Sequence, residues 1–137
     1  MQNSKPILLV EDDQIDAMTV KRALGDLKIV NPLVEVTNGE EVLKYLINHR
    51  NVKPCFILLD LNMPKMNGLE FLKVIKADDT LKSIPVFVLT TSTAKEDTTE
   101  SLRLGASRYM VKSIDYEEFL ETIKIINFLP GVMQITE

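Results

Sequence analysis

Three short apolar runs, each followed at once by polar residues, constrain the fold of this chain more than any other feature. They span residues 7–10, 56–59 and 85–89, and they precede Glu11-Asp12-Asp13, Asp60 and Thr90-Thr91-Ser92-Thr93. Such continuous apolar runs are typical of strands buried on both faces of a parallel sheet. In open parallel sheets, ligands bind at the carboxyl ends of the strands. Asp60 is therefore the first candidate functional residue, the alternative being a turn residue that caps the next segment.

Helical patterns alternate with these runs and with two shorter strand signals, at 34–36 and 109–111. Apolar residues recur at three- and four-residue steps in segments that begin near Asp13, Asn38, Asn67 and Asp115, and a fifth helix, poor in core residues, is predicted after Thr93 from its capping pattern. Capping patterns, with an acid three positions after the cap, occur at Asn38–Glu41, Thr93–Glu96 and Asp115–Glu118. The alternation predicts an α/β fold: a flavodoxin-like, doubly wound, five-stranded parallel sheet in the order 2-1-3-4-5, with five helices.

Composition and charge exclude several classes of protein. A chain of 137 residues with 45% hydrophobic and 26% charged residues suits one globular domain. We expect this domain to span residues 1–128 and a C-terminal tail to span 129–137. The net charge of −4 argues against nucleic-acid binding, which requires concentrated basic residues. The chain shows neither a signal peptide nor an apolar run of membrane-spanning length, so we expect a cytoplasmic protein without membrane contact.

Several reactive or charged side chains are expected to have only structural roles. The single cysteine, Cys55, cannot form an internal disulfide, and its place beside a buried strand predicts a small core residue. Asp13 is interpreted as a helix-start residue. We expect His49 on the surface, and the chain has no second histidine with which it could form a metal site. The pair Asp78-Asp79 is predicted to lie in a solvated loop.

The predicted strand order brings polar residues from separate strand ends together. Strands one and three become neighbours, so Glu11, Asp12 and Asp60 should converge, flanked by Thr90 and Lys112. Clustered carboxylates repel one another unless a cation shares the site. Magnesium fits best, because it takes one or two protein carboxylates and keeps waters that a phosphoryl oxygen displaces. These groups suit phosphoryl transfer, in which Asp60 is the nucleophile, Lys112 a fixed positive charge and Thr90 a hydroxyl donor.

Five motifs in a fixed order extend over nearly the whole chain, from about residue 7 to residue 126. They are Val10-Glu11-Asp12-Asp13, Leu59-Asp60-Leu61-Asn62-Met63-Pro64, Asn67-Gly68-Leu69, Pro85-Val86 through Thr90, and Gly105-Ala106-Ser107-Arg108-Tyr109-Met110-Val111-Lys112. Each motif alone is weak, but the combination is highly specific. On these motifs the chain resembles the receiver domains of two-component response regulators.

The resemblance implies a role for each site residue. Asp60 would accept a phosphoryl group from a phosphohistidine on a sensor histidine kinase or a phosphotransfer protein. Four groups would hold Mg²⁺: Glu11, Asp12, Asp60 and the backbone carbonyl of Asn62. Lys112 would contact the phosphoryl oxygens, and Thr90 would move onto them. Tyr109 would be the switch aromatic that turns inward when the threonine moves.

The chain departs from the family where a proline in a cis peptide usually follows the lysine. Ser113 stands there instead, and a non-proline cis bond costs about 3 kcal/mol, so we expect a trans peptide after Lys112. This substitution, together with the loop through Lys28 to Pro32, is similar to stand-alone receivers related to cyanobacterial phytochrome response regulators. In the family, the residues two positions beyond the aspartate and the threonine, here Asn62 and Ser92, affect the lifetime of the acyl phosphate.

The expected output is a change of surface, because nothing of domain size follows Phe128 in the sequence. The helix after Thr93 is poor in core residues, and with the last strand and last helix it would form a face that signals to a downstream protein or a second copy of the chain. We therefore expect a phosphoacceptor signalling protein and no enzyme. One alternative is a receiver that acts as a scaffold without phosphorylation.

Two alternatives from other classes fit the sequence less well. A phosphatase of the haloacid dehalogenase type also uses an aspartyl nucleophile and Mg²⁺, but it requires a second aspartate where this chain has Asn62. A flavin-binding protein of similar architecture requires a phosphate loop after the first strand, where three acids would repel phosphate.

Overall fold

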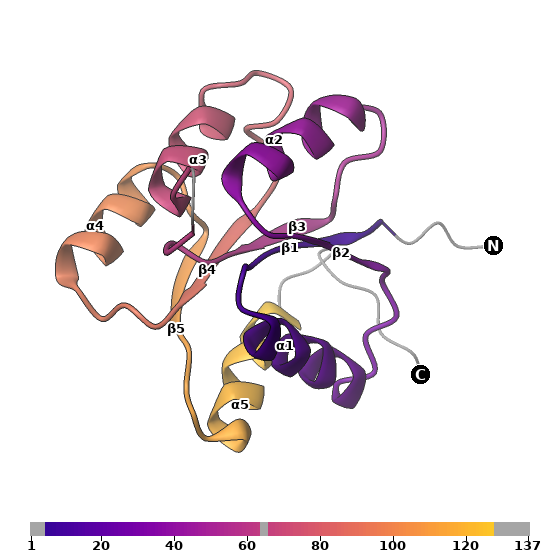
Figure 1. The fold of residues 1–137 in the computed structure, drawn as a ribbon, viewed down its shortest axis with the longest axis vertical. Helices are drawn as coiled ribbons and strands as arrows, with labels where there is room; N and C mark the ends of the chain where they lie inside the picture. The colour runs from indigo at the N-terminus through magenta and orange to yellow at the C-terminus, as the bar shows by residue number, and fades with distance from the viewer. Residues whose placement is uncertain (1–4, 64–65, 128–137) are drawn as a thin grey trace.

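A five-stranded parallel sheet forms the centre of the fold, and helices cover both of its faces (Figure 1). The computed structural model describes residues 5–63 and 66–127. The strands are β1 (Ile7–Val10), β2 (Leu33–Val36), β3 (Phe56–Leu59), β4 (Val86–Thr90) and β5 (Arg108–Val111). The helices are α1 (Gln14–Asp26), α2 (Gly39–Asn48), α3 (Gly68–Lys76), α4 (Lys95–Arg103) and α5 (Tyr116–Asn127). The strand order, β2-β1-β3-β4-β5, confirms the predicted topology.

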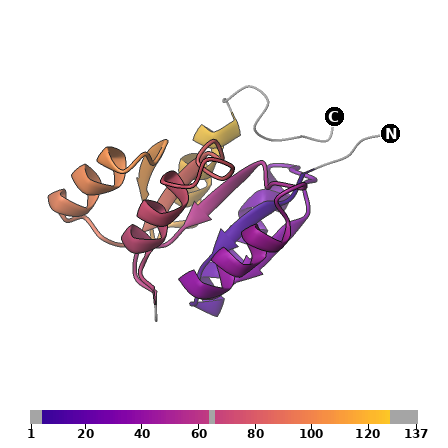
Figure 2. The same ribbon diagram turned by 90° about the horizontal axis from the view of Figure 1, so that it is seen from above.

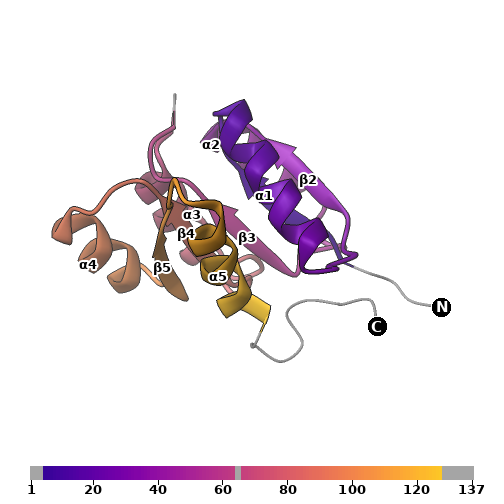
Figure 3. The ribbon, with the colours of Figure 1, turned by 90° about the horizontal axis from the view of Figure 1, so that it is seen from below.

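The helices form two layers, one on each face of the sheet. Figure 2 views the layer of α2, α3 and α4, and Figure 3 views the layer of α1 and α5 from the opposite side. Within the described ranges, every helix is too short or too polar to cross a membrane. The tail predicted at 129–137 lies outside the described residues.

The central strands are buried on both faces, which explains why their sequences are continuously apolar. All four residues of β1 and of β3 are buried. Alternate residues point to opposite faces of the sheet, so Leu8 and Ile57 join the apolar cluster beneath α2 and α3, whereas Ile7 and Phe56 join the cluster beneath α1 and α5. The strands β1 and β3 pair in register, with Val10 opposite Leu59. The residues that follow these two strands therefore leave the sheet side by side.

Side-chain caps fix the start of three helices. The Asp13 carboxylate accepts backbone N–H groups of Ile15 and Asp16, which confirms its predicted role at the start of α1. Asn38 caps α2 as predicted. Asn67 and Glu70 form a reciprocal capping box at the start of α3. The first turns of these helices all begin at the edge of the sheet where the acidic residues lie.

The other two predicted capping boxes are wrong in part or in whole. The α4 helix has Ala94 at its N-cap, without a side-chain cap. Ser92 takes the local hydrogen bonds instead, because its hydroxyl accepts the Ala94 N–H and donates to Asp97, which places the helix start beyond Thr93. At α5, Asp115 does accept the Glu117 N–H. The Glu118 carboxylate, however, accepts the hydroxyl of Ser113 and leaves the box half formed.

The residues expected to be structural behave largely as predicted. Cys55 is half-buried against the core, and burial raises the pKa of its thiol to about 11. His49 is exposed and stacks on the Tyr45 ring. Ile47 of α2 is 52% exposed although it is apolar, because the helix turns it away from the sheet.

The loop after α3 is more ordered than the sequence indicated. The Asp78 carboxylate accepts the N–H groups of Thr80 and Leu81 and forms an ion pair with Arg50. These bonds, the largest contribution coming from Arg50, lower the pKa of Asp78 far below its ordinary value. The predicted loop is confirmed, with Asp79 93% exposed, but Asp78 in addition ties this loop to the end of α2.

Candidate functional site

Three carboxylates from two neighbouring strand ends lie together at the carboxyl edge of the sheet. Glu11 and Asp12 follow β1, and Asp60 follows β3, where its N–H donates to the Val10 carbonyl at 3.1 Å. One oxygen from each carboxylate lies within 4.8 Å of the other two. Glu11 and Asp60 are buried, and Asp12 is exposed. The structure thus brings together the acids that the predicted strand order placed at one edge.

Lys112 supplies the positive charge of the site. It follows β5, and its backbone N–H donates to the Thr90 backbone carbonyl at 2.8 Å. Its Nζ lies 2.6 Å from Glu11 Oε1, 2.7 Å from Asp16 Oδ2 and 3.8 Å from Asp60 Oδ2. The side chain is only 8% exposed. The ammonium is therefore hydrogen-bonded to two carboxylates and within Coulombic reach of the third.

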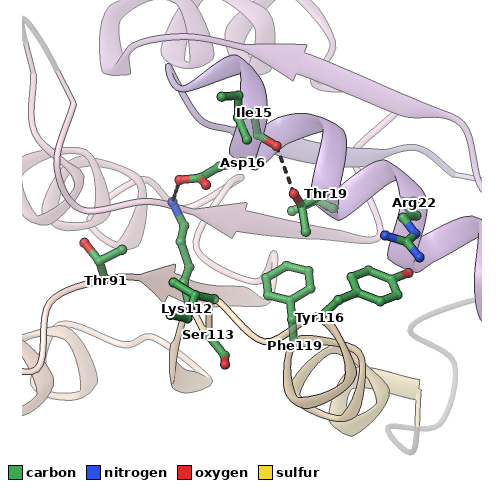
Figure 4. Close-up of a pocket in the computed structure, with 11 residues that line it drawn as sticks. Ile15, Asp16, Thr19, Arg22, Thr91, Lys112, Ser113, Tyr116 and Phe119 are labelled. Atoms are coloured by element: carbon green, nitrogen blue, oxygen red, sulfur yellow. Dashed lines mark hydrogen bonds and ion pairs between the residues drawn. The ribbon is translucent and has the colours of Figure 1, made fainter.

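Asp16 is the site residue that sequence analysis missed. It lies in the first turn of α1, where acids are favoured by the helix dipole, so its presence gave no separate signal. Its partner Lys112 lies 96 positions further along the chain. Only the packing of α1 beside the end of β5 reveals the contact (Figure 4).

Burial and neighbouring charges together raise the pKa of both central groups, which favours the neutral form of Glu11 and the charged form of Lys112. Burial raises the pKa of the Glu11 carboxyl to about 7, against the hydrogen bond from Lys112 that lowers it, and the nearby Asp60 charge adds to the rise. Burial alone would lower the pKa of the Lys112 ammonium, but its hydrogen bonds to Asp16 and Glu11 outweigh burial and raise that pKa. The lysine therefore stays charged, whereas Glu11 titrates near neutral pH.

The raised pKa of Glu11 predicts a loss of stability as the pH rises. The carboxyl is protonated in the folded protein up to about pH 7, but in the unfolded chain only up to about pH 4.5, so the free energy of unfolding falls as pH rises between these values. The loss is at most about 3 kcal/mol. Urea unfolding from pH 4.5 to 8 in EDTA measures it. The Glu11→Gln variant should lack this component, and identical pH profiles for variant and parent would contradict it.

The predicted switch residues lie on β4 and β5. Thr90 is the last residue of β4 and is fully buried. Tyr109 is half-buried, and its hydroxyl donates to the Ser92 carbonyl at 2.8 Å. This bond ties β5 to the loop between β4 and α4. The peptide between Lys112 and Ser113 is trans, as predicted.

Two cavities open beside the acidic cluster. One, of about 340 Å³, lies between α1 and the segment joining β5 to α5, and Lys112 forms part of its wall (Figure 4). The other, of about 390 Å³, is lined by Asp12, Asn62, Asp97 and neighbouring residues. The exposed side chain of Asn62 thus lies beside Asp12 at the opening of the site.

Gly68 lets α3 approach the backbone of the phosphoacceptor candidate. Its N–H donates to the Leu61 carbonyl at 2.9 Å. A Cβ at this position would lie 2.7 Å from the carbonyl oxygen of Asp60 and 2.7 Å from the Cα of Leu61. The turn after β3 therefore closes tightly only with glycine here.

Comparisons with known proteins point to one family. The response regulator receiver domain model matches residues 7–124. The response regulator Rcp1 of Synechocystis sp. is 36% identical over 124 residues, which cover 88% of this chain and 84% of Rcp1. The probable methanogenesis regulatory protein FilR2 of Methanothrix harundinacea is 36% identical over 123 residues, which cover 88% of this chain and 79% of FilR2.

Solved structures agree with this result. The Mn²⁺-bound form of Rcp1 has a TM-score of 0.83 and 34% identity, and the alignment covers 97% of this chain and 99% of that one. The phosphorylated cyanobacterial phytochrome response regulator RcpA has a TM-score of 0.85 and 36% identity, with 98% and 100% covered. The predicted likeness to phytochrome response regulators is thus found again. With its strand order, its acidic edge and these matches, the chain belongs to the response regulator receiver domain family.

Proposed function

We propose that this protein is a phosphoacceptor in two-component signalling, and that Asp60 receives a phosphoryl group from a sensor histidine kinase or a phosphotransfer protein in the cytoplasm. The observation that supports this most directly is the position of the Asp60 carboxylate, which lies within 4.8 Å of two further carboxylates and 3.8 Å from the Lys112 ammonium. A buried acid with both a cation site and a fixed cation beside it suits phosphoryl transfer. We assign this role to a receiver unit of residues 1–128.

The donor set fits Mg²⁺. Hard divalent cations prefer oxygen ligands, and the cluster offers three carboxylates within reach of a single ion. We assign the ligands to Glu11, Asp12, Asp60 and the backbone carbonyl of Asn62. When bound, Mg²⁺ would neutralise charge on the transferred phosphoryl group. The related Rcp1 has been solved in a Mn²⁺-bound form, which supports a divalent-cation site in this chain.

The chain's own residues perform the transfer by position and charge. An Asp60 carboxylate oxygen attacks the phosphorus of a phosphohistidine, the new P–O bond forms as the P–N bond breaks, and the imidazole leaves with the electron pair. The Lys112 ammonium stabilises the equatorial oxygens. The Thr90 hydroxyl moves onto the phosphoryl group. Asn62 and Ser92 influence how readily water attacks the acyl phosphate. The chain's own residues thus act in both steps, and the protein catalyses only its own phosphorylation and dephosphorylation.

The signal leaves through the face formed by α4, β5 and α5. Ser101 is the one residue of α4 that is buried, so this helix shifts at small cost. When Thr90 moves, the loop that carries Ser92 moves with it, and the hydrogen bond from Tyr109 to the Ser92 carbonyl is lost. Tyr109 then turns inward, and the altered face binds a downstream protein or a second copy of the chain.

Incubation with acetyl phosphate and Mg²⁺, followed by intact mass, tests the phosphoacceptor role. We expect the mass of one phosphoryl group to be added, and EDTA to prevent the addition. Hydrogen exchange on the same sample should quicken in α4 and in the loop before it. A parent protein that gains no mass while a verified receiver does so in parallel would favour the phosphorylation-independent scaffold.

A further inference from the structure

The Lys112 ammonium is shared between two carboxylates that differ in their other neighbours. Glu11 belongs to the cluster of three acids that fits a metal ion. Asp16 lies outside that cluster, on α1, yet its carboxylate is 2.7 Å from Lys112 Nζ. A cation held by the acidic cluster would draw on the charge of Glu11. Asp16 would then remain the lysine's partner that does not bind the metal.

The hydrogen-bond capacity of the ammonium points in the same direction. An ammonium has three N–H donors. Glu11 and Asp16 accept two of them, at 2.6 and 2.7 Å. The 3.8 Å separation from Asp60 is too long for a hydrogen bond, so the third donor has no short contact to that carboxylate. The third donor can therefore turn to an oxygen of a phosphoryl group carried by Asp60.

The backbone of Asp16 is fixed in the first turn of α1. Its backbone N–H donates to the Asp13 cap at 3.1 Å, which fixes the first turn of α1. Figure 4 shows its carboxylate facing Lys112 across the space between α1 and β5. The Asp16 side chain is 35% exposed and that of Lys112 only 8%. Asp16 therefore lies between the lysine ammonium and the solvent.

We propose that Asp16 is a positioning residue that aims the Lys112 ammonium at the phosphoryl group on Asp60. This role rests on the proposed phosphoacceptor function. Asp16 touches neither the phosphoryl group nor the metal, and it acts only through the lysine. Its loss therefore slows phosphorylation by misplacing a charge, and it has no effect when the lysine is absent.

A double-mutant cycle tests this role through the rate of phosphorylation by acetyl phosphate at saturating Mg²⁺. Asp16→Ala should slow the reaction on the order of tenfold. Asp16→Asn, which keeps an oxygen acceptor, should recover most of that loss. In the Lys112→Ala background, adding Asp16→Ala should change the rate less than about twofold. Asp26→Asn on the same helix, whose carboxylate accepts the Tyr116 hydroxyl, is the matched control and should react like the parent.

A second measurement does not depend on phosphorylation. In the metal-free protein, the Lys112 ammonium should give a protected nitrogen NMR signal, because its protons are held by two carboxylates, and the signal should broaden in Asp16→Ala. An unphosphorylated parent would overturn the proposed function itself. A phosphorylated parent with an equal or faster rate in Asp16→Ala, an undiminished effect of Asp16→Ala without Lys112, or an unchanged NMR signal would each overturn only the positioning role.

Discussion

Replacing Asp60 with asparagine is expected to abolish phosphorylation by acetyl phosphate and Mg²⁺. The neutral amide is not a nucleophile that forms an acyl phosphate, and it removes one of the three carboxylates of the proposed metal site. We expect the rate to fall by at least about a thousandfold, which intact mass would record as no added phosphoryl group within hours.

The matched control for this variant is Asp13→Asn. Asp13 lies close to the same cluster in sequence, but its carboxylate caps α1, and asparagine is an equally good cap. This control should be phosphorylated like the parent. If Asp60→Asn still gained a phosphoryl group, the acceptor would be another residue, and the assignment of Asp60 would be wrong.

Replacing Gly68 with alanine is expected to cost about 3 kcal/mol of stability. The new Cβ would lie 2.7 Å from backbone atoms of both Asp60 and Leu61, so either α3 or the end of β3 must shift. Urea unfolding at constant m-value measures the loss in the free energy of unfolding. Because the displaced atoms belong to the backbone of the proposed phosphoacceptor, Asp60, phosphorylation of the folded variant should also slow.

Gly25→Ala provides the matched control for Gly68→Ala. Gly25 lies within α1 and has open space where a Cβ would be added. Alanine there should raise the free energy of unfolding by about 0.5–1 kcal/mol, because alanine favours the helix and restricts the unfolded chain. Equal stabilities for Gly68→Ala and the parent would mean that the turn after β3 yields to the extra carbon without cost.

The sequence predicts those features that depend on local pattern and on sheet topology. The buried run that ends at Asp60 identifies a central strand, because a strand covered on both faces has no polar alternation. Once the strand order is assumed, the convergence of Glu11 with Asp60 follows from parallel pairing of β1 and β3. The acidic residues of the site and Lys112 can thus be predicted from the sequence.

Contacts between distant surface positions are not predictable in this way. The bond from Asp16 to Lys112 depends on how α1 lies against the end of β5, which no residue pattern specifies. The start of α4 was misplaced because the capping pattern at Thr93 competes with Ser92, whose hydroxyl takes the hydrogen bonds that define the turn. In both cases, several nearby side chains could form the contact, and the three-dimensional packing determines which of them does.

Among residues 5–63 and 66–127, the sheet separates two apolar clusters that share no residue, one beneath α1 and α5 and the other beneath α2 and α3. Substitutions in one cluster therefore need little compensation in the other, since independent sites are close to additive. We expect homologues to vary the helices on either side of the sheet at separate rates.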